Sequence, residues 1–117
     1  MSALPIPRGM FRDRKLLDLA HRCDRCMNCE RFMVDGCEPA HSNEYQHGKA
    51  KALKSHDCFH AALCHECHAW YDNQRGGGND PTGLYDSTAG DKVAMFARAS
   101  SRTFLHYWRM GWLKVAA

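Results

Sequence analysis

Long apolar runs are missing from this sequence. No window of its 117 residues is long and apolar enough to span a membrane, so we expect no membrane partner. The opening stretch MSALPIPRGMFRDRK carries prolines and charges where a secretory signal peptide has its apolar segment. Internal repeats and low-complexity tracts are also absent, which excludes repeat architectures. Together these absences predict a cytoplasmic protein.

A large excess of charge of one sign is missing too. The chain has 16 lysines and arginines against 13 aspartates and glutamates, and the net charge of +3 permits nucleic-acid binding without requiring it. Apolar residues make up 44% of the chain and charged residues 25%, a mixture that argues against wholesale disorder. This length predicts a single domain, residues 1–117, whose modest core would gain from a cross-link such as a metal.

Cysteine and histidine are abundant, with seven and eight residues respectively. In a reducing compartment, clustered cysteines more often bind metal than form disulfides. Cys64 and Cys67 form one Cys-x-x-Cys pair, and the second pair is either Cys23/Cys26 or Cys26/Cys29. Two such pairs supply the four thiolates of a closed structural zinc site. We favour Cys26 and Cys29, because the CMNC stretch adjoins a predicted hairpin whose end needs anchoring.

The remaining cysteines and several histidines receive simpler interpretations. Cys37 and Cys58 have no partner at ligand spacing and are interpreted as small apolar thiols. His21, His65 and His106 are interpreted as surface or packing residues. A thiol redox protein would also contain Cys-x-x-Cys, but the duplicated pairs and the missing βαβ pattern argue against that class.

Apolar periodicity and turn residues divide the chain into short elements. Strands are predicted on either side of Asp35–Gly36, with Pro39 making the second one an edge or irregular strand. Residues 75–83, RGGGNDPTG, form the clearest linker. The other predicted elements are a helix over 12–22, a polar basic loop over 43–57, a return strand over 58–63, a helix over 66–73 and a helix over 91–110.

The predicted C-terminal helix has two distinct faces. Its basic face is either an ordinary solvated surface or a stripe that follows phosphates, and the sequence leaves both readings open. Its apolar face is more typical of core packing than of stacking against bases. The basic face contains Arg98, Arg102, His106 and Arg109, and the apolar face contains Val93, Phe96, Ser100, Phe104 and Tyr107.

The order of the motifs resembles a known family. CMNC is followed by AHSN, then by HGKAKALKSHD, and then by ALCHECHAWYD. This arrangement, over about residues 23–73, resembles the HNH-like, or ββα-metal, nucleases, and in particular the small phage and prophage nucleases of the YbcO-like kind. The resemblance implies a small α+β fold, in which a zinc-stapled ββα-metal (HNH-like) core at about 23–75 carries the N-terminal and C-terminal helices.

The resemblance also implies an activity and a setting. It implies a metal-dependent endonuclease that hydrolyses DNA, so that DNA is the expected partner. It further implies a role in phage or prophage DNA metabolism or recombination. If the gene belongs to a phage, the protein would work in the cytoplasm of the host cell.

Individual residues take family roles through the same resemblance. His41 takes the place of the general base, and His68 that of the last histidine that binds the catalytic ion, Mg²⁺ or another divalent cation. Asp57 matches an acidic position before the second strand, where it either binds that ion or fixes the loop. The places of the structural zinc ligands are taken by Cys26, Cys29, Cys64 and Cys67.

Two positions depart from the family pattern. Ala40 stands where many family members have an ion-binding acid or histidine, and the central asparagine is missing from DCFHAAL. These departures favour the alternative function, a zinc-ribbon-like module that binds nucleic acid or protein without cutting. The catalytic ion would need His68 together with some of Asp57, His56, His60 or Asn43.

The residue types fit phosphodiester hydrolysis on chemical grounds as well. A histidine near neutral pKa can accept the proton of the attacking water, and a divalent ion can polarise the phosphate and stabilise the leaving oxygen. The basic loop has no acid between Gln46 and His56. Its lysines are either DNA contacts or solvated charge, and they are Lys49, Lys51 and Lys54.

Overall fold

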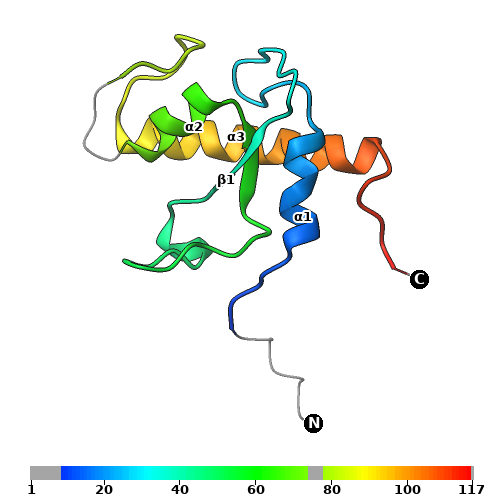
Figure 1. Cartoon of the computed structure of the whole chain (residues 1–117). Helices are drawn as coiled ribbons and strands as arrows, with labels where there is room; N and C mark the ends of the chain where they lie inside the picture. Colours follow the sequence, from blue (N-terminus) through cyan, green and yellow to red (C-terminus); the bar gives the residue numbers. More distant parts are fainter. Residues whose placement is uncertain (1–8, 74–77, 117) are drawn as a thin grey trace.

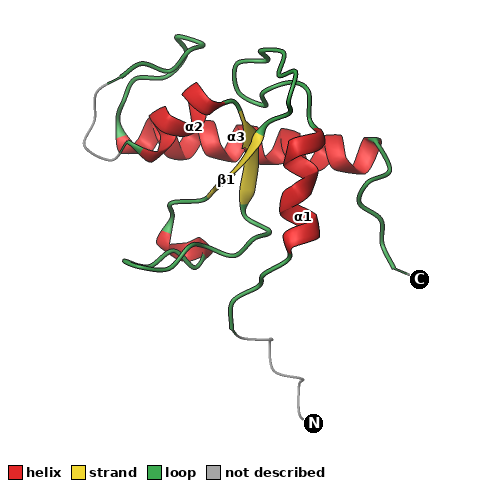
Figure 2. Cartoon of the chain, in the orientation of Figure 1, coloured by secondary structure: helices red, strands yellow, loops and turns green. Residues whose placement is uncertain are grey.

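A two-stranded antiparallel sheet stands at the centre of the fold (Figure 1, Figure 2). The computed structural model describes residues 9–73 and 78–116, and in these ranges three α-helices and two 3-10 helices accompany the sheet. The strands are β1, Glu38–His41, and β2, His60–Leu63, and α2, His65–Asp72, follows β2 directly. The predicted small α+β class is confirmed, and the central elements follow in the order strand, strand, helix.

The N-terminal helix is interrupted. The predicted range 12–22 contains α1, Arg14–Asp18, followed by the 3-10 helix η1, Leu19–Arg22. Asp13 caps the start of α1, because its side chain accepts a hydrogen bond of 3.1 Å from the amide of Leu16. The prediction of a short helix before the first cysteine pair is therefore correct, although its second half winds more tightly.

The hairpin predicted around Asp35–Gly36 is wrong, although its second strand is present as β1. Residues 31–34 form no strand, and β1 pairs with β2 instead. Gly36 has a φ of +82°, and a Cβ placed on it would overlap the carbonyl oxygen of His21. Only glycine allows the chain to approach η1 this closely, so the Asp-Gly pair marks a packed turn and not a hairpin.

The register of the sheet positions the predicted general base. The pairing runs from Glu38 opposite Leu63 to His41 opposite His60. Pro39 lies within β1, where its missing N–H is tolerated because both strands of a two-stranded sheet are edge strands. All residues of β2 are buried, so this strand belongs to the core and β1 presents His41 at its end.

The C-terminal helix α3, Ala89–Arg109, runs behind the strand pair and agrees with the prediction over 91–110 (Figure 1). Thr88 caps its start by accepting a hydrogen bond of 3.1 Å from the amide of Asp91. No helix within the described ranges has both the length and the apolar composition that crossing a membrane requires.

The buried face of α3 is rotated from the predicted one. Val93 is 41% exposed, so the apolar face does not begin there. Thr103 is fully buried, and its Oγ1 accepts a hydrogen bond of 3.0 Å from the amide of Ala62 in β2. Packing against β2 therefore buries Thr103, a polar residue that apolar periodicity alone does not assign to the buried face. The buried residues are Lys92, Met95, Phe96, Ala99, Thr103 and Tyr107.

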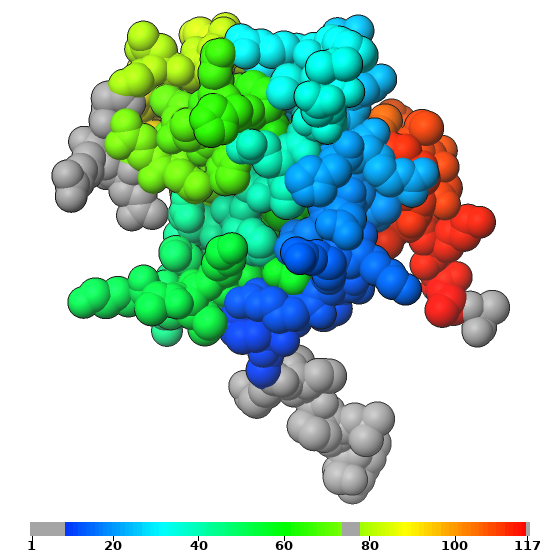
Figure 3. Space-filling model, viewed as in Figure 1, coloured from blue at the N-terminus to red at the C-terminus, as the bar shows by residue number. Residues whose placement is uncertain are grey.

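The loop predicted over 43–57 is largely irregular, with one short 3-10 helix, η2, Tyr45–His47. It projects from the rest of the molecule and leaves a recess between itself and α2 (Figure 3). The linker predicted over 75–83 lies partly outside the described residues, and from residue 78 the chain runs through bends and turns to α3.

Candidate metal centre and histidine pocket

Four cysteines form a compact group, the four-cysteine cluster. Two come from the loop after η1 and two from the start of α2, and they are Cys26, Cys29, Cys64 and Cys67. Their Sγ atoms all lie within 4.8 Å of one another. Zn–S bonds of about 2.3 Å in a tetrahedral site place the sulfurs about 3.8 Å apart, so the cluster has nearly this size already. The four residues are positioned to hold a metal ion.

The structure also decides between the two candidate pairs. Cys29 Sγ lies 3.7 Å from Cys64 Sγ, within the cluster. Cys23 is completely buried outside the cluster, and its thiol donates to the carbonyl of Leu19 at 3.7 Å. Burial raises the pKa of Cys23 to about 11, which keeps its thiol protonated. The preference for Cys26 and Cys29 is confirmed.

Hydrogen bonds support thiolate in the four-cysteine cluster. The amide of Asn28 donates to Cys26 Sγ and the amide of Cys67 donates to Cys64 Sγ, both at 3.4 Å. Hydrogen bonds from the thiols of Cys64 and Cys67 hold the pKa of Cys26 well below its ordinary range. The same contact with Cys26 raises the pKa of Cys64 to about 11. Thiolate is the form of cysteine that binds metal, and the cluster favours it at Cys26.

Asn28 makes a contact with the four-cysteine cluster that the sequence did not reveal. Its side chain is buried, and Nδ2 donates to Cys67 Sγ at 3.4 Å and to Asp80 Oδ1 at 2.8 Å. The other carboxylate oxygen of Asp80 accepts from the amides of Leu84 and Tyr85. The segment before α3 is thereby tied to the cluster through one buried asparagine.

A second site, the histidine pocket, occupies the recess between α2 and the 43–57 loop (Figure 3). Its volume is about 460 Å³. It contains both predicted catalytic histidines and two of the three predicted DNA-binding lysines. The lining residues are Pro39, His41, Ser42, Asn43, Lys49, Lys54, His68 and Asp72.

Asp57 lies behind His41 and does not line the pocket. Its Oδ1 lies 2.8 Å from His41 Nε2 and 3.3 Å from Arg12, and its Oδ2 accepts a hydrogen bond of 2.7 Å from the amide of Asp13. Burial alone would raise the pKa of Asp57, but the donors around it hold that pKa below its ordinary value. Both oxygens are engaged, so the geometry supports an orienting role for Asp57 over ion binding.

This arrangement determines which nitrogen of His41 is basic. An ionised carboxylate only accepts hydrogen bonds, so the neutral His41 ring donates from Nε2 to Asp57. Nδ1 then carries the lone pair. A histidine held by a carboxylate through one nitrogen and basic at the other has the arrangement that general-base catalysis uses.

His68 lies between two carboxylates. Its Nε2 is 3.0 Å from Asp72 Oδ2 and its Nδ1 is 2.7 Å from Glu38 Oε1. The hydrogen bond with Asp72, together with Glu38, raises the pKa of His68 against the effect of burial. Asn43 Nδ2 donates to the other oxygen of Asp72 at 2.9 Å. The motifs in the sequence did not reveal Asp72 and Glu38 as partners of His68, although Asp72 stands one helical turn after it.

Two other candidate ion ligands have structural roles. His60 is completely buried, with Nδ1 2.7 Å from the carbonyl oxygen of Asp57 and Nε2 2.9 Å from the hydroxyl of Tyr107. Burial lowers the pKa of His60, so the neutral ring donates from Nδ1 and accepts at Nε2. His56 Nδ1 accepts a hydrogen bond of 2.9 Å from the amide of Phe11. Neither residue lines the histidine pocket.

The pocket also separates the three loop lysines, because Lys49 and Lys54 line it and Lys51 does not. The sequence predicts that these lysines bind DNA. On that expectation, replacing Lys49 and Lys54 together by alanine should weaken binding and lower the slope of log K against log salt by up to about 2, since each phosphate contact on duplex DNA contributes about 0.9. Lys51→Ala is the matched control and should leave the slope close to wild type. Fluorescence anisotropy in a salt titration measures both, and an unchanged slope in the double variant would show that these lysines are only solvated charge.

No family model, curated protein or solved structure gives a significant match to this chain. The likeness to HNH-like nucleases therefore stays a prediction from the sequence motifs. Function has to be inferred from the four-cysteine cluster and from the side chains of the histidine pocket.

Proposed function

We propose that the protein is an HNH-like, metal-dependent endonuclease that hydrolyses DNA phosphodiester bonds. The histidine pocket is the observation that supports this most, because His41, His68 and two lysines converge there from β1, α2 and the loop. The lysines supply positive charge for a phosphate, and His41 has a basic nitrogen oriented by a carboxylate. A purely structural zinc module has no need for this combination.

In the proposed reaction His41 is the general base. Nδ1 accepts a proton from a water molecule, the hydroxide attacks phosphorus, and the bond to the 3′ oxygen breaks. The 3′ oxygen leaves with the bonding electrons and takes a proton from solvent, and His41 then returns its proton to solvent. Asp57 holds the ring through Nε2 and stabilises the imidazolium that forms. Lys49 and Lys54 bind the charged phosphate oxygens.

Two residues of the histidine pocket, His68 and Asp72, suit a catalytic cation, and Glu38 would orient the His68 ring. His68 and Asp72 face each other with 3.0 Å between Nε2 and Oδ2, and Glu38 lies against the other ring nitrogen. Imidazole nitrogen and carboxylate oxygen are ligands that Mn²⁺, Zn²⁺ and, through oxygen, Mg²⁺ accept. When bound, such an ion polarises the phosphate and stabilises the leaving oxygen.

For the four-cysteine cluster we propose structural Zn²⁺. A buried set of four cysteine sulfurs is typical of closed zinc sites and leaves no open position for a substrate. The ion would join the loop after η1 to the start of α2. Since His68 directly follows Cys67, the zinc would also fix the direction in which α2 presents His68.

One observation favours the alternative, a zinc-ribbon-like module that binds nucleic acid or protein without cutting. Ala40, which precedes the proposed base, is fully buried and has no ligand atom. In that case His41 and His68 would have no catalytic role and would only form the hydrogen bonds described above. The two functions differ in whether the histidine pocket binds an exchangeable cation.

His68→Ala and Asp72→Asn should each weaken Mn²⁺ binding and DNA cleavage by at least about 10- to 100-fold, the range seen even for outer-shell partners of metal sites. His21→Ala is the matched control, because His21 is an exposed histidine in η1 and does not line the histidine pocket. Titration calorimetry with Mn²⁺ and cleavage at rising Mn²⁺ concentrations measure the two effects. Partial rescue at high Mn²⁺ with unchanged zinc content is expected, and unaltered Mn²⁺ affinity in both variants would favour the alternative module.

A further inference from the structure

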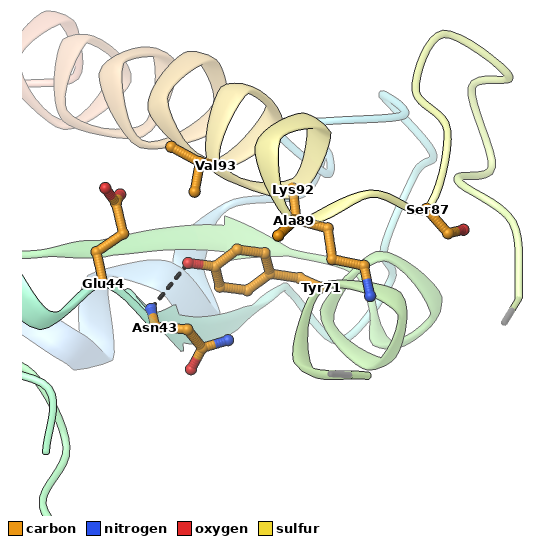
Figure 4. Close-up of a pocket in the computed structure, with 7 residues that line it drawn as sticks. All are labelled: Asn43, Glu44, Tyr71, Ser87, Ala89, Lys92 and Val93. Carbon is orange, nitrogen blue, oxygen red and sulfur yellow. Dashed lines mark hydrogen bonds between the residues drawn. The ribbon is translucent and has the colours of Figure 1, made fainter. Parts of the chain in front are cut away.

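A second pocket, the side pocket, adjoins the histidine pocket. It lies between the end of β1, α2 and the first turns of α3, and its volume is about 300 Å³ (Figure 4). This is the lower end of the range for small-molecule sites. The residues that line it are Asn43, Glu44, Tyr71, Ser87, Ala89, Lys92 and Val93. The proposed reaction uses none of their side chains directly.

The side pocket has an apolar wall and a polar rim. Ala89 and Val93 present apolar surface from α3 (Figure 4). The Tyr71 ring is fixed beneath them, because it is 3% exposed and stacks on Phe96 with 5.0 Å between ring centroids. Asn43, Glu44 and Lys92 lie at the edge of this wall, where Lys92 Nζ donates to the carbonyl of Asn73 and Asn43 Nδ2 donates to Asp72. An apolar wall with a few hydrogen-bonding groups at its edge is the environment that binds unstacked nucleobases.

Asn43 connects the two pockets, since it lines both. Its amide donates a hydrogen bond of 2.8 Å to the hydroxyl of Tyr71 in the side pocket (Figure 4), and its side chain donates one of 2.9 Å to Asp72 in the histidine pocket. Asn43 is two residues from His41, so their Cα atoms are at most about 7 Å apart. This separation is comparable to one extended nucleotide.

We propose that the side pocket binds the base of a nucleotide that adjoins the scissile phosphate, so that the substrate is DNA with an unpaired nucleotide at the cut. This inference rests on the proposed nuclease function. A base inside a duplex is stacked and paired, and it reaches a protein pocket only after it is extruded. In a single strand the base is already free, so single-stranded DNA is the preferred substrate.

Val93→Trp tests the proposal by filling the side pocket without altering the residues of the histidine pocket. The helix tolerates the change, because valine and tryptophan have similar helix propensities. Ala94→Trp is the matched control, since Ala94 is the exposed next residue and does not line the side pocket. The substrate is a single-stranded oligonucleotide whose cut bond is mapped with wild-type protein and Mg²⁺ or Mn²⁺. Two further copies carry an abasic site on one or the other side of that bond.

Loss of one base contact should lower kcat/KM by about 5-fold or more, the lower end of what one base stacked on an aromatic side chain contributes, because the wall is mostly aliphatic. This loss should appear when the Val93→Trp variant cuts the intact oligonucleotide. It should also appear when wild type cuts one of the abasic copies. The two changes combined should cost no more than either alone, because they remove the same contact. Ala94→Trp should cut like wild type, and a duplex of the same sequence should be cut at least about 10-fold more slowly.

The outcomes separate this proposal from the nuclease function. Three results would overturn the base-binding role and leave the nuclease function standing. They are losses that multiply when Val93→Trp meets the abasic copy, normal cutting of both abasic copies, and equal cutting of duplex and single strand. Cutting of the duplex alone would overturn the base-binding role and keep the nuclease function. No cutting of either the oligonucleotide or the duplex by zinc-loaded, folded wild type would overturn the nuclease function and this proposal with it. Zinc content and melting temperature of each variant confirm that the fold is retained.

Discussion

Replacing Cys64 by serine should release the bound metal and unfold the protein. Cys64 contributes a sulfur to the four-cysteine cluster and also caps α2, because its Sγ accepts a hydrogen bond from the amide of Cys67. Structural zinc sites bind with apparent free energies of about 10–16 kcal/mol. The free energy of unfolding of a whole domain is about 5–15 kcal/mol. The binding free energy lost with the ion is therefore about as large as the whole free energy of unfolding, so the variant should unfold.

Elemental analysis and thermal melting followed by circular dichroism measure this effect. Wild type should contain about one zinc per chain, a stoichiometry that follows from one four-thiolate site. Cys58→Ser is the matched control, because Cys58 is half-buried outside the cluster, and it should keep both zinc and melting temperature. Cys23→Ser should keep zinc and melt at a lower temperature, since it changes a buried packing residue. A Cys64→Ser protein with full zinc and wild-type melting would contradict the structural role of the cluster.

His41→Ala should abolish most DNA cleavage while leaving the fold intact. General acid–base catalysis contributes typically about 10²- to 10⁴-fold, so the cleavage rate should fall by at least about 100-fold. The variant removes the proton acceptor and its hydrogen bond with Asp57, and the lysines and the four-cysteine cluster stay in place. DNA affinity and zinc content should therefore be close to wild type.

Added imidazole provides a specific check on the role of His41. A free imidazole that enters the vacated position should restore part of the cleavage, because it replaces the missing base without repairing any other contact. His21→Ala, which removes an exposed histidine from η1, is the control and should cut like wild type. Cleavage by His41→Ala within a few-fold of wild type would assign the proton transfer to another group.

Features set by local spacing could be predicted from the sequence. The two Cys-x-x-Cys pairs identified the cluster because two thiolates three positions apart already converge on one point. The helix over 91–110 was predictable because its length and periodicity exceed what any strand would show. The family resemblance, and not local spacing, assigned His41 and His68 to one site, and the structure places both in the histidine pocket.

Features that depend on contacts distant in the chain could not be predicted. Gly36 resembles a hairpin turn until the carbonyl of His21 is known to lie against it. Asp57 looks like an ion ligand until Arg12 and Asp13 are found at its oxygens. The partner of Asn28 is Asp80, 52 positions away in the sequence. Local spacing carries no information about such pairs.

Incubating the purified wild-type protein with supercoiled plasmid and with single-stranded DNA tests the central claim most directly. Each substrate is exposed to Mg²⁺, to Mn²⁺ and to a brief excess of chelator, and the zinc content of the protein is measured in parallel. The nuclease function predicts cleavage with Mg²⁺ or Mn²⁺, loss of cleavage with chelator, and recovery when the divalent ion is restored. Intact DNA under all conditions, with zinc retained and the protein folded, would contradict it and leave the zinc module that binds without cutting.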